Sequence, residues 1–380
     1  MTRALLACLL LAAPAAAADR RPITDTDLFR FVWIADPRLS PDGTRVAFVR
    51  VTADEKREGY ETAIWMVPAD GSEPARPFTG GPGDTAPRWS PDGRTLAFLR
   101  AEMKDGKREP AQIHLIPAGG GEARAVSEVP RGAGAPVWSP DGRWLAFTAT
   151  ANDRDVEAAR RRQAGGKDAA GERESDVRVI TGSVYRGDGS GYDDPARPRH
   201  VWLLEVPAPG GKAEARPLTR GPFDEDDLAW SHDGARVFFT SHRARDRAYE
   251  GPEGDVFSVP REGGEPRREA SIDGPIGGYA LAADGRRIAF TGYVNPRPVR
   301  SYDQQDLFLA GAGEAARNLT SEYDADVGGG ILGDQRAPRG GLATPLVWTA
   351  DQRALIFKSA RRGRGNLARL DLGSGTVSAL

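Results

Sequence analysis

The hydrophobic positions of the chain recur in the same order in six segments. Each segment has a polar turn that contains an aspartate, followed by a short apolar run such as Val46-Ala47-Phe48-Val49. The turn aspartates are Asp42, Asp92, Asp141, Asp233, Asp284 and Asp351. Six residues after each aspartate stands a phenylalanine: Phe48, Phe98, Phe147, Phe239, Phe290 and Phe357. Most successive aspartates lie about 50 residues apart, the spacing of a repeated structural unit.

The turns predict tight hairpins. In Ser-Pro-Asp-Gly, proline fixes φ at the second turn position, aspartate tolerates the third, and glycine accepts a positive φ. The strand after the turn is apolar on both faces, which suits sheets stacked face to face. Each unit contains four such strands, so the sequence predicts an all-β fold, a β-propeller of four-stranded blades over residues 38–380. A β-sandwich would not repeat one motif at fixed offsets.

Two long spacings between aspartates predict insertions. The first lies in blade three at about residues 150–198; its charged first part predicts a solvated helix or a loop, and its glycine- and tyrosine-rich second part predicts an ordered excursion. The second insertion, about 321–344, is glycine-rich. Loops of this length are often functional or disordered, and the sequence leaves both readings open.

The first eighteen residues predict a signal peptide rather than part of the fold. A positive start precedes an apolar run, and small residues lead to a cut after Ala18. Anchoring as a lipoprotein at Cys8 is the weaker alternative, because little apolar sequence precedes that cysteine. Residues 19–37 then lead into the propeller, and the protein is expected to be periplasmic or secreted. Cys8 is the single cysteine, which excludes thiol chemistry in the mature chain.

Composition narrows the function further. A net charge of -2 with scattered arginines does not favour nucleic-acid binding. The four histidines lack zinc-ligand spacing, and we expect no metal and no cofactor. Because the aspartates recur once per unit, they indicate turn geometry rather than acid–base catalysis. The tryptophans three residues before them (Trp89, Trp138, Trp230 and Trp348) share one register, which predicts packing between blades rather than ligand stacking.

Three stretches resemble a known family. They are TDTDLFRFVWIADPRLSPDG from Thr24, RVITGSVYRGDGSGYDD from Arg178 and RHVWLLEV from Arg199. They resemble the propeller of the prolyl oligopeptidase family of serine peptidases, in its bacterial acylaminoacyl-peptidase and dipeptidyl-peptidase branch. The resemblance implies a propeller that gates and selects short peptides for a C-terminal α/β-hydrolase domain with Ser, Asp and His. It also implies seven blades, so the seventh is expected to be missing here.

The chain departs from the family pattern in two ways. It contains no G-x-S-x-G motif, so it is expected to have no catalytic residue and to be inactive by itself, as a piece truncated before the hydrolase domain. A standalone propeller is the alternative. It also lacks the adjacent glutamates by which some dipeptidyl peptidases hold an amino terminus. The acidic neighbours Glu225-Asp226-Asp227 and Asp193-Asp194 do not sit in such a motif, which argues against strict dipeptidyl activity.

Four residues of the blade-three excursion are candidates for contact with substrate or with another domain: Arg178, Tyr185, Arg186 and Tyr192. The competing interpretation is that they only order the excursion. A second function remains under consideration, a non-catalytic periplasmic propeller that binds protein partners as Tol-system propellers do. The first repeat begins at Leu39, soon after the signal cut, which leaves no room for the domain that precedes those propellers. Neither function predicts a nucleic-acid partner or a membrane span in the mature chain.

Overall fold

The computed structural model describes residues 21–380 except 82, 166–176, 181–184, 188–190, 209, 212, 245–252, 296–297, 299–302, 312 and 330–345. The predicted signal peptide and its cleavage site therefore lie outside the described residues. No helix in the described ranges is long and apolar enough to cross a membrane. A short 3₁₀ helix, η1 (Asp25–Arg30), precedes the first strand.

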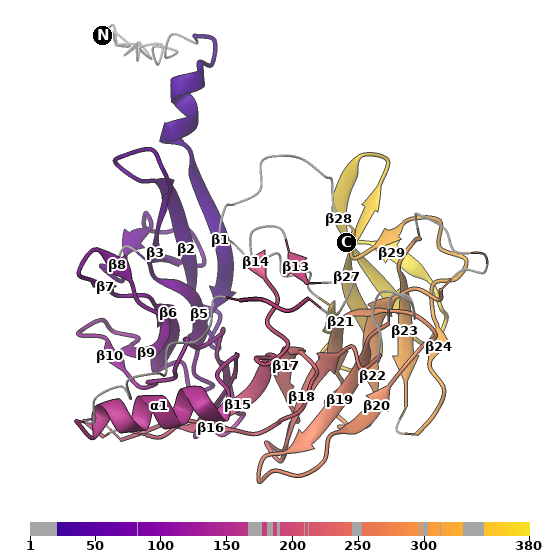
Figure 1. Cartoon of the computed structure of the whole chain (residues 1–380). Coiled ribbons are helices and arrows are strands. Elements are labelled where there is room, and N and C mark those ends of the chain that lie inside the picture. The colour runs from indigo at the N-terminus through magenta and orange to yellow at the C-terminus, as the bar shows by residue number, and fades with distance from the viewer. Residues whose placement is uncertain are drawn as a thin grey trace, which may run out of the picture.

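Six antiparallel sheets follow one another around a ring, which confirms the predicted all-β propeller (Figure 1). In each sheet the strand before the aspartate turn pairs with the strand after it, which in turn pairs with the third strand of the blade. We number the blades in chain order. Blade one begins with β1 at Val32, ahead of the boundary at residue 38 inferred above.

The strands of the first three blades are β1 (Val32–Leu39), β2 (Arg45–Ala53), β3 (Tyr60–Pro68) and β4 (Arg76–Pro77); β5 (Thr85–Trp89), β6 (Thr95–Arg100), β9 (Gln112–Pro117) and β10 (Arg124–Ala125); and β11 (Val137–Trp138), β12 (Trp144–Ala149), β15 (His200–Glu205) and β16 (Arg216–Pro217). Those of the last three blades are β17 (Glu225–Trp230), β18 (Arg236–Ser241), β19 (Asp255–Pro260) and β20 (Arg267–Ala270); β21 (Ile276–Leu281), β22 (Ile288–Gly292), β23 (Asp306–Ala310) and β24 (Arg317–Asn318); and β25 (Asp326–Val327), β26 (Leu346–Trp348), β27 (Ala354–Arg361), β28 (Arg364–Asp371) and β29 (Val377–Ala379).

The aspartate turns have the predicted geometry. In blade one Gly43 donates its amide to the carbonyl of Ser40 at 2.9 Å, and its φ is +73°. The Ser40 hydroxyl donates to Asp42 Oδ1 at 2.6 Å, and that oxygen also accepts the amide of Thr44. A serine or threonine makes the same bond to the aspartate in blades two, three, four and six. The repeated aspartates therefore hold hairpins.

The repeated phenylalanines of blades two to six form the core between blades, each packing toward the preceding blade. Phe98 lies in one cluster with Ile64 and Met66 of blade one. Phe290 packs against Phe308 within its own blade at a ring distance of 5.4 Å, and shares a cluster with Phe238 of blade four. From blade two onward each of these side chains is at most 1% exposed, namely Phe98, Phe147, Phe239, Phe290 and Phe357.

The repeated tryptophans join the inner strands of neighbouring blades. The indole of Trp138 donates to the carbonyl of Arg88 at 3.0 Å, and that of Trp89 donates to the carbonyl of Arg38 at 3.0 Å. Trp230 and Trp348 make the same bond to Val137 and Ala280 of the preceding blades. This confirms that their shared register serves packing between blades. Blade five has Leu281 at this position, so the step from blade four lacks an indole donor.

The first insertion joins the second and third strands of blade three, and the second interrupts the inner strand of blade six. The first begins with α1 (Asp153–Gln163), which is the helix rather than the loop among the two predictions for its charged sequence. It also contains the hairpin of β13 (Arg186–Gly187) and β14 (Gly191–Tyr192). The second divides the inner strand of blade six, because β25 and β26 both pair with β27. Most of it lies outside the described residues. A further hairpin, β7 (Met103–Lys104) with β8 (Lys107–Arg108), extends blade two and was not predicted.

Candidate functional site: the central channel

A cavity of about 990 Å³ lies at the centre of the ring. Its walls come from the inner strands β1, β5, β11, β17 and β21, and each strand contributes the residues just before its turn. This size falls within the range of small-molecule and peptide sites, about 300–1,000 Å³. The cavity is therefore the place in the described structure where a short peptide would be surrounded by several blades.

β-Bulges in the inner strands determine which side chains face this channel. The register of β1 shifts between Ala35 and Arg38, β5 and β17 shift at the same repeat position, and β21 shifts one residue earlier in the repeat. Asp36, Ala86 and Asp227 occupy the bulges with φ of +45°, +54° and +52°. A non-glycine residue in this conformation costs about 1–2 kcal/mol, and aspartate is among the residues that tolerate it. The bulge interrupts the alternation of the strand and re-aims the next side chains.

Blades one and two give the channel a basic wall. Arg38 and Arg88 line the cavity, and both bind Asp36, which lies behind them. Arg38 Nε donates to Asp36 Oδ1 and Arg88 Nη1 donates to Asp36 Oδ2, each at 2.7 Å. Burial lowers the pKa of Arg88, although Asp36 opposes that change. An arginine nevertheless stays charged near neutral pH, so the wall carries two cations and one anion.

Blade four gives the channel an acidic wall. Asp226 and Asp227 line the cavity, and Asp226 Oδ1 lies 3.3 Å from Arg199 Nε. Asp227 is exposed and its Oδ2 accepts the Thr240 hydroxyl at 3.1 Å. Tyr279 of blade five donates its hydroxyl to the carbonyl of Asp227 at 2.7 Å. Burial raises the pKa of Tyr279, so the hydroxyl stays neutral and keeps the bulge in place.

The neighbouring Glu225 turns away from the channel. Its side chain is 1% exposed and accepts the amide of Val201, the hydroxyl of Thr219 and, at 3.1 Å, Arg243 Nη2. A buried carboxylate with this many donors is a structural group that ties blade three to blade four. Of the three acidic neighbours in the sequence, the fold therefore presents two to the channel and uses one as a link between blades.

Blade three separates the charged walls with apolar groups. Val137 and Trp138 line the channel there, together with Trp89 from blade two. The combination of aromatic, cationic and anionic groups can bind and orient a peptide. Among the described residues no group of three His, Cys, Asp or Glu is placed to hold a metal ion.

The four excursion residues predicted from the sequence lie together: Arg186 and Tyr192 are in one small hairpin, Tyr185 directly precedes it, and Arg178 packs against it. The guanidinium of Arg178 sits 5.1 Å from the ring centre of Tyr192, and Arg186 pairs with Tyr192 across β13 and β14. Tyr185 accepts the amide of Asp193 at its carbonyl. In the view of Figure 1 this hairpin appears over the middle of the ring. These contacts order the hairpin; whether the four residues also touch a substrate stays a prediction.

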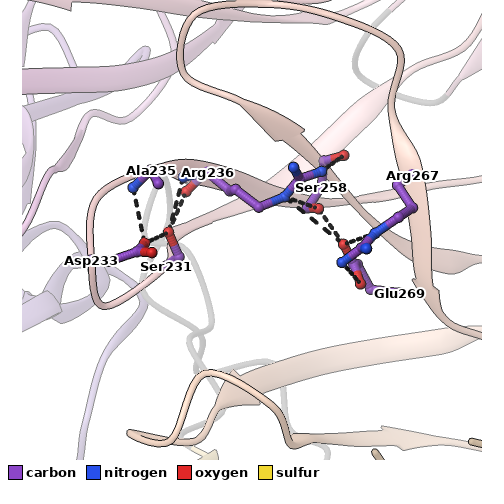
Figure 2. A network of polar contacts seen from close by, with 7 residues as sticks. All are labelled: Ser231, Asp233, Ala235, Arg236, Ser258, Arg267 and Glu269. Carbon is purple, nitrogen blue, oxygen red and sulfur yellow. Dashed lines mark hydrogen bonds and ion pairs between the residues drawn. The ribbon is translucent and has the colours of Figure 1, made fainter. Parts of the chain in front are cut away.

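A second polar cluster lies at the outer part of blade four. Figure 2 shows Glu269 between Ser258 and Arg267, with Arg236 on the other side of Ser258. Arg267 binds both carboxylate oxygens of Glu269 at 2.9 Å, and Arg236 Nε donates to Ser258 Oγ at 2.8 Å. The cluster borders a crevice of about 300 Å³ beside Leu281. Because Arg236 binds Ser258 of β19 and Ser258 binds Glu269 of β20, the cluster links three strands of the blade and holds the outer strand in place.

Comparison with known proteins agrees with this architecture. No family model matches the chain. A curated relative, "Uncharacterized peptidase YuxL" of Bacillus subtilis (strain 168), is 36% identical over 97 residues, which is 25% of this chain and 14% of the relative. The acylaminoacyl peptidase of Pyrococcus horikoshii has a TM-score of 0.60 at 18% identity, covering 93% of this chain and 46% of that one. Prolyl oligopeptidase B from Galerina marginata has a TM-score of 0.53 at 12% identity, covering 92% and 42%.

These likenesses confirm the fold expected from the resemblance. The structural neighbours are acylaminoacyl and prolyl oligopeptidases, and the curated relative carries the name of a peptidase. The chain spans less than half the length of these solved peptidases, and the matched residues make up 14% of the curated relative. Sequence reasoning missed Arg38 and Arg88 as site residues. The available signal was that, of the six residues four positions before the turn aspartates, only these two are charged.

Proposed function

We propose that this chain is the propeller part of an exported serine peptidase of the prolyl oligopeptidase family, and that its central channel admits and selects short peptides. The observation that carries the proposal is the channel itself, about 990 Å³ in volume and lined by charged and aromatic side chains of five inner strands. The likeness to peptidase propellers and the relative named as a peptidase support it.

The channel would act by size and by charge. A folded protein does not fit a cavity of this volume, whereas a peptide of a few residues does. The sequence has no G-x-S-x-G nucleophile motif, so the nucleophile, its histidine and its carboxylate would belong to another part of the protein. In that arrangement the propeller contributes access and orientation, while the hydrolytic step takes place beyond this chain.

The test is an assay of the product of the complete gene. We expect the reading frame around these codons to encode an α/β-hydrolase, and the product to cleave aminoacyl-p-nitroanilides in a reaction that a serine-directed phosphonate stops. Residues 19–380 alone should cleave none. A gene that encodes no hydrolase, together with one stoichiometric protein partner recovered from the periplasm, would replace this proposal by the Tol-like alternative.

The proposed export is tested on the same preparation. Protein isolated from the periplasm or medium should begin at Asp19, as read by amino-terminal sequencing. A protein that retains residues 1–18, or that carries a lipid on Cys8, would contradict the predicted cut after Ala18.

A further inference from the structure

The charged side chains of the channel are divided by sign between its two sides. Arg38 and Arg88 come from blades one and two, whereas Asp226 and Asp227 come from blade four. Val137 and Trp138 of blade three lie between them on the wall. Along the circumference the lining therefore changes from basic to apolar to acidic.

The ion pairs of the described residues leave each wall with charge of its own sign. On the basic side one carboxylate, Asp36, is shared by two guanidinium groups, which leaves one positive charge in excess. On the acidic side Asp226 has Arg199 at 3.3 Å, while the side chain of Asp227 accepts a bond from a neutral hydroxyl, that of Thr240. One negative charge in excess remains there. Fixed charges along walls of low polarity concentrate the electric field in a cleft.

An unblocked peptide carries the complementary pair of charges. Its terminal carboxylate accepts two parallel hydrogen bonds from a guanidinium, the geometry in which arginine binds carboxylates best. Its terminal ammonium is a compact cation that a carboxylate binds. The apolar stretch between the walls, with Trp89 and Trp138, provides contact area for the side chains of the peptide.

We propose that the channel binds short unblocked peptides in one orientation, with the terminal carboxylate at Arg38 and Arg88 and the terminal ammonium at Asp226 and Asp227. This deepens the proposed function, on which it rests for the passage of peptides through the ring. It adds a substrate class, short peptides with both termini free, and a direction in which they enter.

The experiment uses the mature chain, residues 19–380, and three probes: tetra-alanine, its carboxy-terminal amide and its amino-terminal acetyl form. Binding is measured by calorimetry and by the fluorescence of the tryptophans in the channel wall. We expect tetra-alanine to bind best and each blocked form to bind at least about tenfold more weakly, because each loses one charge-assisted contact. Both preferences should shrink as salt is raised.

Two substitutions assign the termini to the walls. Arg38→Gln should remove the preference for the free carboxylate and keep that for the free amine. Asp227→Asn should do the reverse, and asparagine accepts the left-handed conformation of the bulge. Arg143→Gln is the matched control, since Arg143 pairs with Glu205 on the exposed outer part of blade three and does not line the channel. It should leave all three affinities unchanged.

Several outcomes overturn the proposal. They are equal binding of acid and amide by the unsubstituted chain, loss of affinity by the same factor for all three probes in Arg38→Gln, and absence of binding for every probe. The comparison of acid with amide needs no variant, so a variant that fails to fold leaves the proposal testable. An active full-length peptidase whose propeller binds tetra-alanine and its blocked forms equally well would contradict this inference alone. Oriented binding by a chain whose gene encodes no peptidase would contradict only the proposed function.

Discussion

At the scale of single residues, the turn aspartates stabilise the hairpin of each blade. Each accepts backbone amides just after the turn and, in five blades, a hydroxyl from the residue two positions earlier. In blade five, where Ala282 replaces the serine, Asp284 binds the amides of Arg286 and Arg287 instead. In blade six Gln352 replaces the glycine at φ of +58°, and its side chain accepts the amide of Ala283 across the blade boundary.

These hydrogen bonds make the hairpins sensitive to acid. The hydroxyl of Ser40 and the amide of Thr44 lower the pKa of Asp42 to about 2. A carboxylate whose pKa is depressed in the folded state stabilises it above the unfolded pKa of about 4, and that contribution is lost as the pH falls toward the folded value. We expect the melting temperature to fall from pH 5 to pH 3, and to fall less in Asp42→Asn. Parallel curves for the two proteins would contradict this account.

At the scale of elements, stability depends on the interface between each blade and the next, which is called a step below. A buried phenylalanine contributes about 1.5–3 kcal/mol by leaving water, and one indole hydrogen bond about 1 kcal/mol net. Apolar packing therefore dominates each step, and the tryptophan bond fixes how the inner strands line up around the channel. The step between blades four and five has packing in the cluster around Phe290 but no indole bond, and the crevice beside Leu281 lies there.

Trp138→Phe tests the contribution of the indole bond. The phenyl ring keeps part of the packing, but the carbonyl of Arg88 loses its donor, which costs about 1–3 kcal/mol if no water replaces it. We expect a lower midpoint of unfolding in urea. The matched control is Trp65→Phe, because Trp65 lies in β3 and does not occupy the repeat position. Equal losses in both variants would mean that ring size, rather than the hydrogen bond, explains the effect.

At the scale of the whole molecule, blade one differs from the others, because the described residues leave apolar side chains on one of its faces exposed. Phe48, the repeat phenylalanine of blade one, is only 7% exposed, but it belongs to none of the apolar clusters formed by the described residues. Cross-strand pairing places it on the same face as Ile34 and Leu39, which are 63% and 60% exposed. In Figure 1 this strand, β1, stands across the opening of the ring from blade six. In every later blade the corresponding face is covered by its predecessor.

An uncovered apolar face should make the chain bind hydrophobic dye and associate with itself. We expect Ile34→Lys with Leu39→Lys to reduce dye fluorescence and the mass measured by light scattering, without a fall in melting temperature. The control is Val294→Lys, another exposed apolar position that lies outside blade one. A sharply melting monomer with little dye binding before substitution would contradict this expectation.

Blade number, strand order and the core phenylalanines follow from the sequence alone, because a repeat that places Asp, Trp and Phe at fixed offsets encodes the same local hydrogen bonds and the same packing each time. The opposed charges of the channel do not follow from it. Arg38 and Asp227 are distant in sequence and stand in different copies of the repeat, and only closure of the blades around a common axis, with a bulge in β1 and in β17, brings them to the same cavity. Turns and core positions depend on residues that are close in sequence, so they can be predicted from the repeat. A site built from five strands depends on how the blades are arranged in space, so only the folded structure shows it.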